Sequence, residues 1–164
     1  MLALASGINV LNRTTGRLAS YIALPLIIVV VYEVFMRYVF NAPTVWAFEA
    51  TTLMYGCHFA LGFGYTHQHN GHVAIDVFEA KLSERPRTIL RIGVNLLFFV
   101  STMGLMSFYG ARYALASWQN WELASTSWAP PLYPFKTVLA IGFLLMFLQG
   151  IAKLIEDFKS LGGK

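Results

Sequence analysis

Charged side chains within long apolar segments have the most chemical content in this sequence. Glu33 and Arg37 lie four residues apart in one apolar run, and Glu49 lies near the start of the next. An acidic residue four positions before a basic one can form an ion pair on one helix face. A charge at the centre of a bilayer costs about 2.5–3.5 kcal/mol on insertion scales, so such residues persist where they pair or act. We expect these three residues, with Arg112 of a third apolar run, to form a structural polar clamp.

Two further charges can extend this clamp. Lys136 stands at the start of a fourth apolar run, and Glu122 lies in the segment before it. Together with the clamp they make three acidic and three basic groups, which predicts a neutral polar layer that holds the helices together. The alternative interpretation is that the basic side chains simply extend to the lipid headgroups.

Histidines are the second group of residues that could do chemistry. His58 lies within an apolar run, where a haem ligand would need a second histidine on a facing helix. All four histidines lie between residues 58 and 72, so no such pair can form, and we expect no cofactor. His67, His69 and His72, with Asp76 nearby, have a spacing that could hold a divalent metal. Histidines in a polar loop are more often simply solvated.

Other functional classes leave no pattern in the sequence. No nucleophile–base arrangement and no glycine-rich phosphate loop is evident, so we do not expect an enzyme. Cys57 is the single cysteine, which excludes a disulfide within the chain. Glu33 could suggest a small proton-coupled exporter, but Arg37 one turn away would keep its carboxylate ionised. The exporter remains a minor alternative.

The composition predicts the elements that position these residues. The chain has 164 residues, of which 57% are hydrophobic and 12% charged, about half the charged fraction of a soluble domain. A helix needs about 20 apolar residues to cross a bilayer. Four segments satisfy this requirement, at roughly residues 18–38, 46–65, 92–114 and 133–155. We predict a single all-α membrane domain over residues 1–164, with short interfacial helices at the N-terminus and in the loop between the second and third spans.

The distribution of basic residues predicts how these helices cross the membrane. Nine of the twelve Lys and Arg residues fall on one side, namely Arg13, Arg17, Lys81, Arg85, Arg87, Arg91, Lys153, Lys159 and Lys164. The side richer in Lys and Arg faces the cytoplasm. Both termini are therefore predicted to be cytoplasmic, in a multi-pass protein. The distribution of the basic residues thus sets the topology, and the net charge of +4 does not indicate a nucleic-acid partner.

A characteristic motif surrounds the first clamp residues. Residues 37–49 read RYVFNAPTVWAFE, in which Phe40, Asn41, Pro43 and Trp46 follow Arg37 and precede Glu49, and the Asn and Pro predict a short turn between the first two spans. Two other motifs follow, LGFGYTHQHNGHVAIDV at residues 61–77 and STSWAPPLYPFK at residues 125–136. The sequence resembles the small membrane subunit of tripartite ATP-independent periplasmic (TRAP) transporters. The three motifs in this order carry the resemblance, which covers almost the whole chain.

One motif departs slightly from the family pattern. The family commonly has a basic residue in the stretch where this chain has histidines, ahead of the cytoplasmic loop motif formed by His72 and Asp76. The rest of the pattern, including the aromatic and proline-rich approach to the fourth span, is similar to the family.

The resemblance implies a subunit of the bacterial inner membrane that does not itself carry substrate. In that family a large membrane subunit holds the substrate and sodium sites, and a periplasmic protein captures the substrate, usually an organic acid. The small subunit is a fixed scaffold that helps to dock the binding protein. The implied docking residues are Trp121, Glu122, Ser127, Trp128 and Lys136. An anchoring or assembly subunit of another membrane complex remains the alternative.

Overall fold

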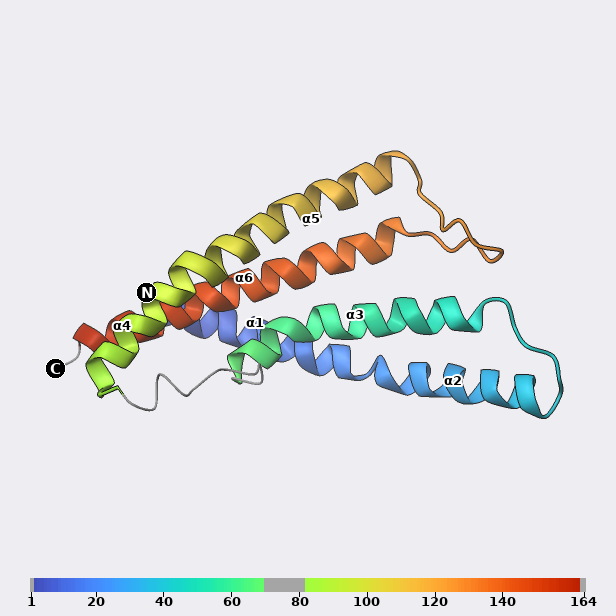
Figure 1. Ribbon diagram of the computed structural model, residues 1–164, viewed down its shortest axis with the longest axis horizontal. Coiled ribbons are helices and arrows are strands. Elements are labelled where there is room, and N and C mark those ends of the chain that lie inside the picture. The colour runs from blue at the N-terminus through green and yellow to red at the C-terminus, as the bar shows by residue number, and fades with distance from the viewer. Residues whose placement is uncertain (1, 70–81, 163–164) are drawn as a thin grey trace.

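Long helices make up almost all of the computed structural model, which describes residues 2–69 and 82–162 (Figure 1). The helices are α1 (Leu2–Ser20), α2 (Ala23–Tyr38), α3 (Ala47–Gln68), α4 (Glu84–Val94), η2 (Asn95–Val100), α5 (Ser101–Gln119) and α6 (Tyr133–Gly162). These two ranges contain no strand, and an isolated bridge joins Leu123 to Pro131. The predicted all-α class is confirmed.

The first long helical segment of the bundle, called here the first rod, is formed by two consecutive helices with one interruption. Helices α1 and α2 follow each other along nearly the same direction, separated by a turn at Tyr21 and Ile22 (Figure 1). Pro25 has no N–H to donate to the Tyr21 carbonyl, which instead accepts a bond of 3.3 Å from the Leu24 amide. The proline therefore interrupts the helix one turn before itself and does not end the rod.

The second rod is built from α4, η2 and α5. It runs from Glu84 to Gln119, and its middle part, η2, is a π-helical stretch. Such wider turns occur mostly as short insertions within α-helices. The Asn95 side chain in η2 donates a hydrogen bond of 3.3 Å to the Gly150 carbonyl on α6. The insertion is thus joined to the neighbouring helix.

The centre of the bundle is formed by α1, α3 and α6. Helix α6 packs against α1, α3 and α5, whereas α2 packs mainly on α3 and α5 mainly on α6. At one crossing, a Cβ on Gly142 of α6 would come within 2.5 Å of the Ala60 carbonyl oxygen on α3. Only glycine permits this approach, and small residues are what bring membrane helices together. Helices α2 and α5 therefore flank a core of three helices.

Three segments are long and apolar enough to cross a membrane: Ala3–Tyr38, Glu84–Gln119 and Tyr133–Leu161. The remaining predicted span corresponds to α3, which has 22 residues but contains Glu49 and His58 and is less apolar. Three of the four predicted spans are thus supported by length and composition, and the fourth stays a prediction.

The N-terminal helix packs within the bundle, whereas the sequence predicted an interfacial helix. Helix α1 continues the line of α2 and packs against α3 and α6, where Ala5 and Ile8 are buried with Ala152 of α6. Helix α2 alone has 16 residues, about 24 Å, which is shorter than a bilayer core of about 30 Å. A span at this position must include the last turns of α1. The predicted interfacial helix between the second and third spans falls largely outside the described residues.

Helix α1 begins and α6 ends at the same end of the bundle, called here the terminal end (Figure 1). The turn at residues 39–46 and the loop at residues 120–132 lie at the opposite end, called the loop end (Figure 1). The two ends hold different polar groups.

Candidate functional site

Glu33 organises the turn at the loop end of α2. Its Oε1 accepts hydrogen bonds from Arg37 Nη2 at 2.6 Å and Nε at 3.1 Å. Its Oε2 accepts bonds from the Thr44 hydroxyl at 2.6 Å and the Thr44 amide at 3.2 Å. One carboxylate therefore binds its own helix with one oxygen and the 39–46 turn with the other. The Glu33–Arg37 part of the expected clamp thus joins α2 to the turn that follows it and does not reach another helix.

Glu49 has a different partner from the one expected. The Thr126 hydroxyl of the 120–132 loop donates a hydrogen bond of 2.7 Å to Glu49 Oε2. Arg37 meanwhile forms its ion pair with Glu33. The structure thus replaces the expected Arg37–Glu49 pair with two separate interactions, one of which joins α3 to the loop.

Arg112 is not brought to the other clamp residues. It lies on an exposed face of α5, with its guanidinium carbon 6.0 Å from the centroid of the Phe108 ring. Helix α5 packs mainly against α6, away from Glu33 and Arg37 on α2. The expected single layer of six charges is therefore divided into separate groups in the structure.

The family-motif residues form the 39–46 turn and its contact with the loop. Asn41 has a φ of 51°, a left-handed conformation that asparagine tolerates better than most residues. Phe40 and Pro43 on either side are exposed. Trp46 lies between Tyr32, with ring centroids 5.9 Å apart, and Trp128 of the 120–132 loop, at 6.3 Å. The turn and the loop are thus in contact through aromatic rings.

The 120–132 loop folds back on itself as a narrow hairpin. The Ala124 amide donates to the Pro130 carbonyl at 2.9 Å, and the Leu132 amide to the Glu122 carbonyl, also at 2.9 Å. Trp121 at one bend has a φ of 46°. These bonds give the loop a defined shape although it contains no regular strand.

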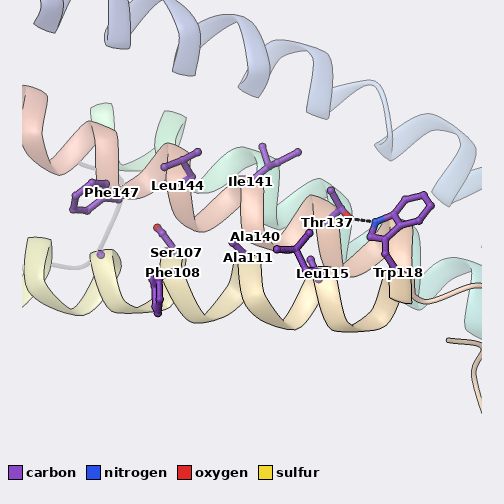
Figure 2. A pocket seen from close by; sticks show the side chains of 12 residues that line it. Ser107, Phe108, Ala111, Leu115, Trp118, Thr137, Ala140, Ile141, Leu144 and Phe147 are labelled. Carbon is purple, nitrogen blue, oxygen red and sulfur yellow. Dashed lines mark hydrogen bonds between the residues drawn. The ribbon is translucent and has the colours of Figure 1, made fainter. Parts of the chain in front are cut away.

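Aromatic rings attach the base of this loop to the helices. Trp118 packs against Tyr133 with centroids 4.3 Å apart, and Trp121 against Tyr133 at 5.4 Å. The Trp118 indole N–H donates a bond of 2.9 Å to the Thr137 hydroxyl on α6 (Figure 2). Indole and phenol rings of this kind settle at the headgroup level of a bilayer.

Lys136 is the buried charge of the loop end. It is 6% exposed, pairs with Glu122, and places its ammonium 3.8 Å from the centroid of the Tyr113 ring. The hydrogen bond from Lys136 lowers the pKa of Glu122, which lies in the loop. Of the expected docking residues, Trp121, Ser127 and Trp128 are exposed and Glu122 is partly exposed. Lys136 lies beneath this surface and is not part of it.

An apolar groove runs between α5 and α6 (Figure 2). Its volume is about 600 Å³, and the Trp118–Thr137 hydrogen bond lies at one end of it. Its walls are formed mainly by Phe108, Ala111, Leu115, Ile141, Leu144 and Phe147. A groove of this composition suits apolar chains or side chains and offers little to a polar solute.

The terminal end contains a polar seam that the sequence patterns did not reveal. Asn12 donates to the Gln149 side-chain oxygen at 2.7 Å, and Gln149 donates to Asn9 at 2.8 Å. Asn9 in turn donates to Glu156 at 2.9 Å. These four residues, called here the inner seam, join α1 to α6. Gln149 within an apolar run is the one signal that could have indicated it, because buried amides usually pair.

Asn12 also explains a close approach between α1 and α3. The residue is fully buried, and a Cβ on Gly64 of α3 would overlap its amide group. Asn12 Oδ1 has no hydrogen-bond partner among the described residues and lies against the Gly64 backbone. Contact with a Cα–H group is a weak substitute for a hydrogen bond.

His58 supports the interruption between α1 and α2. Its Nδ1 lies 2.8 Å from the Ala19 carbonyl oxygen, which also accepts the Ile22 amide. A carbonyl can only accept, so His58 must carry a proton on Nδ1. This histidine thus has a structural partner on α1.

His67 and His69 lie in the last turns of α3 and just after it. His67 stacks on Phe99 with centroids 4.3 Å apart, and His69 Nδ1 lies 2.9 Å from the Tyr65 carbonyl oxygen. His72 and Asp76, the expected loop motif, lie outside the described residues. Within residues 2–69 and 82–162, no three His, Cys, Asp or Glu side chains gather in a way that could hold a metal ion.

Comparison with protein families identifies the family of this chain. Residues 26–160 match the family model described as tripartite ATP-independent periplasmic transporters, DctQ component. The match begins within α2 and includes α3, the loop-end residues and nearly all of α6, while α1 precedes it. A comparison with curated proteins finds no match. The chain therefore belongs to the DctQ family, the small permease component of TRAP transporters.

Proposed function

We propose that this chain is a non-catalytic scaffold subunit of a sodium-coupled TRAP transporter for organic acids. It would hold a large membrane subunit in place and help to dock a periplasmic substrate-binding protein at the loop end. The observation that carries this proposal is that the acidic groups at the loop end all have fixed partners. Glu33 binds Arg37 and Thr44, Glu49 binds Thr126, and Glu122 binds Lys136.

Fixed partners argue against transport by this chain alone. A proton-coupled exporter needs a carboxylate that can gain and lose a proton as the substrate moves. Glu33 accepts four hydrogen bonds, two of them from a guanidinium, and these stabilise its ionised form. The groove between α5 and α6 is apolar and offers no polar path. These features favour a static subunit over the exporter alternative.

The packing of the bundle suits a scaffold. Helices α1, α3 and α6 approach closely through Gly64 and Gly142, which resists changes in their spacing. Helix α2 has no buried residue, and most of the large apolar side chains of α5 are exposed. Two apolar faces on opposite flanks of a packed core are available to lipid and to a larger membrane subunit.

The connectivity supports four spans with both termini on the same side of the membrane. Helix α3 returns along α2 from the loop end to the terminal end, so it covers the same depth as its neighbours (Figure 1). If the three apolar segments cross, α3 must cross with them. The polar residues of α3 are tolerated because Glu49 and His58 have partners within the chain. Because nine of the twelve Lys and Arg residues are predicted on the side of the termini, the terminal end would then face the cytoplasm of a bacterial inner membrane.

The loop end has the form of a docking surface. The 39–46 turn and the 120–132 loop are joined by the Thr126–Glu49 hydrogen bond and the Trp46–Trp128 contact. Trp121 and Leu123 are 66% and 57% exposed on this surface. Exposed aromatic groups on a defined backbone are typical of protein-binding sites. The substrate class and the sodium coupling rest on what membership of the family implies.

Reconstitution tests this proposal directly. The chain, the large subunit and the binding protein together in liposomes should take up an organic acid when a sodium gradient is applied. Omission of this chain should abolish uptake, and this chain alone should give none. Uptake by the chain alone would overturn the scaffold role, and failure to co-purify with a large subunit would favour another membrane complex. A thiol reagent added from outside should label a cysteine introduced by Ser125→Cys but not one introduced by Lys159→Cys.

A further inference from the structure

The environment of Lys136 is unusual for a lysine at the start of a membrane helix. Such a side chain normally extends its ammonium to the headgroups and the water beyond. Here the ammonium lies over the Tyr113 ring of α5, 3.8 Å from its centroid, and the residue is 6% exposed. A cation over an aromatic face is attracted by the ring quadrupole. The lysine is thus held within the protein between α5 and α6.

The second partner of Lys136 is in the loop. Glu122 pairs with the ammonium from above, so that one charge connects α6, α5 and the 120–132 loop. The Glu122 backbone is fixed as well, because its amide donates to the Ser117 carbonyl at 3.1 Å and its carbonyl accepts the Leu132 amide at 2.9 Å. A side chain that holds Glu122 therefore holds both arms of the loop at their base.

The position of the loop base determines where the loop tip lies. From Glu122 the hairpin continues through the Ala124–Pro130 bond to Thr126 and Trp128. Thr126 donates a hydrogen bond to Glu49 on α3, and Trp128 contacts Trp46 of the 39–46 turn. The loop can make these two contacts at its tip only if its base keeps a fixed position relative to α3 and the 39–46 turn.

We propose that Lys136 is a positioning residue that holds the 120–132 loop in one conformation before any partner binds. The pair and the ring contact preorganise the exposed residues Trp121, Ser127 and Trp128 for a protein partner on this face. Preorganisation improves binding because less conformational entropy is lost when the complex forms. The identity of the partner as a periplasmic binding protein rests on the proposed function, whereas the positioning of the loop does not.

The first part of the test measures the loop itself. In the purified complex of the two membrane subunits, hydrogen exchange is followed at the Ala124 and Leu132 amides, which are bonded in the structure. Lys136→Met should increase exchange at both amides by about tenfold, since local opening would no longer break the charged pair. Lys159→Met is the matched control, because this exposed lysine lies at the other end of α6. Unchanged exchange in Lys136→Met would overturn the proposal.

Two further variants keep this test informative if Lys136→Met folds poorly. Glu122→Gln alters only the loop partner, whose side chain is 38% exposed, and should give the same increase in exchange. The double variant Lys136→Glu with Glu122→Lys restores an ion pair but places a carboxylate over the Tyr113 ring. Because the ring attracts cations, this swap should rescue the loop only in part, and full rescue would remove Tyr113 from the proposal.

The second part of the test measures docking. Uptake is followed while the concentration of the binding protein is varied. Lys136→Met should raise the half-saturating concentration by about threefold or more, and by a larger factor than it lowers the maximal rate. If exchange increases but the half-saturating concentration is unchanged, the loop is positioned by Lys136 and the docking part of the proposed function is wrong. If both are unchanged, the positioning proposal is wrong.

Discussion

Asn12 of α1 and Gln149 of α6 are joined by a hydrogen bond of 2.7 Å, and neither residue is more than 1% exposed. They are 137 positions apart in the chain, and Asn12 lies outside the residues that match the family. The bond makes α1 an integral part of the core. Buried amides that pair are directional, so they define one register between the helices in a way that apolar packing does not.

The close contact between α1 and α3 predicts a strong position effect for alanine. Gly64→Ala would place a methyl group on the Asn12 amide, whereas Gly62→Ala on the same helix meets nothing within 4 Å. Overpacking of this kind costs about 1–3 kcal/mol, so Gly64→Ala should lower the midpoint of thermal unfolding in detergent. Gly62→Ala is the control and should leave the midpoint unchanged or raise it slightly, because alanine favours a helix more than glycine does. Equal midpoints for the two variants would contradict the packing of Asn12 on Gly64.

The inner seam predicts coupling between two distant substitutions. Asn12→Leu and Gln149→Leu should each destabilise the protein, because each leaves a buried amide without its partner. The double variant should be less destabilised than the sum of the two, by about 0.6–1.7 kcal/mol as for other interhelical bonds in membranes. A double-mutant cycle of unfolding free energies in mild denaturant measures this coupling. Simple additivity would show that the bond does not form in the bilayer.

The loop end makes the opposite prediction for Arg37 and Glu49. Since Arg37 binds Glu33 and Glu49 binds Thr126, Arg37→Met and Glu49→Leu should have additive effects on the yield of folded protein. Glu33→Gln and Arg37→Met should instead be strongly non-additive, because they remove the same ion pair. Fluorescence-detected size exclusion of each single and double variant provides the comparison. A double Arg37→Met, Glu49→Leu variant that is better folded than either single variant would restore the expected direct clamp.

The Glu122–Lys136 pair predicts a pH dependence with a definite sign. The hydrogen bond from Lys136 lowers the pKa of Glu122 in the folded protein. A carboxyl group with a lowered folded pKa stabilises the protein above its unfolded pKa, and this contribution is lost as the pH falls through the folded value. The difference in unfolding midpoint between the wild type and Glu122→Gln should therefore be constant from neutral pH down to the ordinary range of a carboxyl group. It should decrease below that range, and a difference that grew with falling pH would contradict the pairing.

The part of the structure that could be predicted from the sequence is local. Runs of about 20 apolar residues determine helices long enough for a membrane, and the positions of Arg and Lys predict their orientation. The Glu33–Arg37 pair was foreseeable because residues four apart on a helix are neighbours whatever surrounds them. The motif around Asn41 likewise indicated a turn and the family. Each of these features depends on a few consecutive residues.

The partners of the other polar groups were decided by the tertiary structure. Glu49 binds Thr126, which is 77 positions away in the chain, because the 120–132 loop folds over α3. No rule of local sequence spacing predicts a pair with this separation. Lys136 is buried because Tyr113 and Glu122 converge on it from two other elements. Asn12 meets Gln149 because glycine at position 64 lets α1 approach α3 and α6. Helix formation is a property of neighbouring residues, whereas the pairing of buried charges and amides depends on how close whole helices can come.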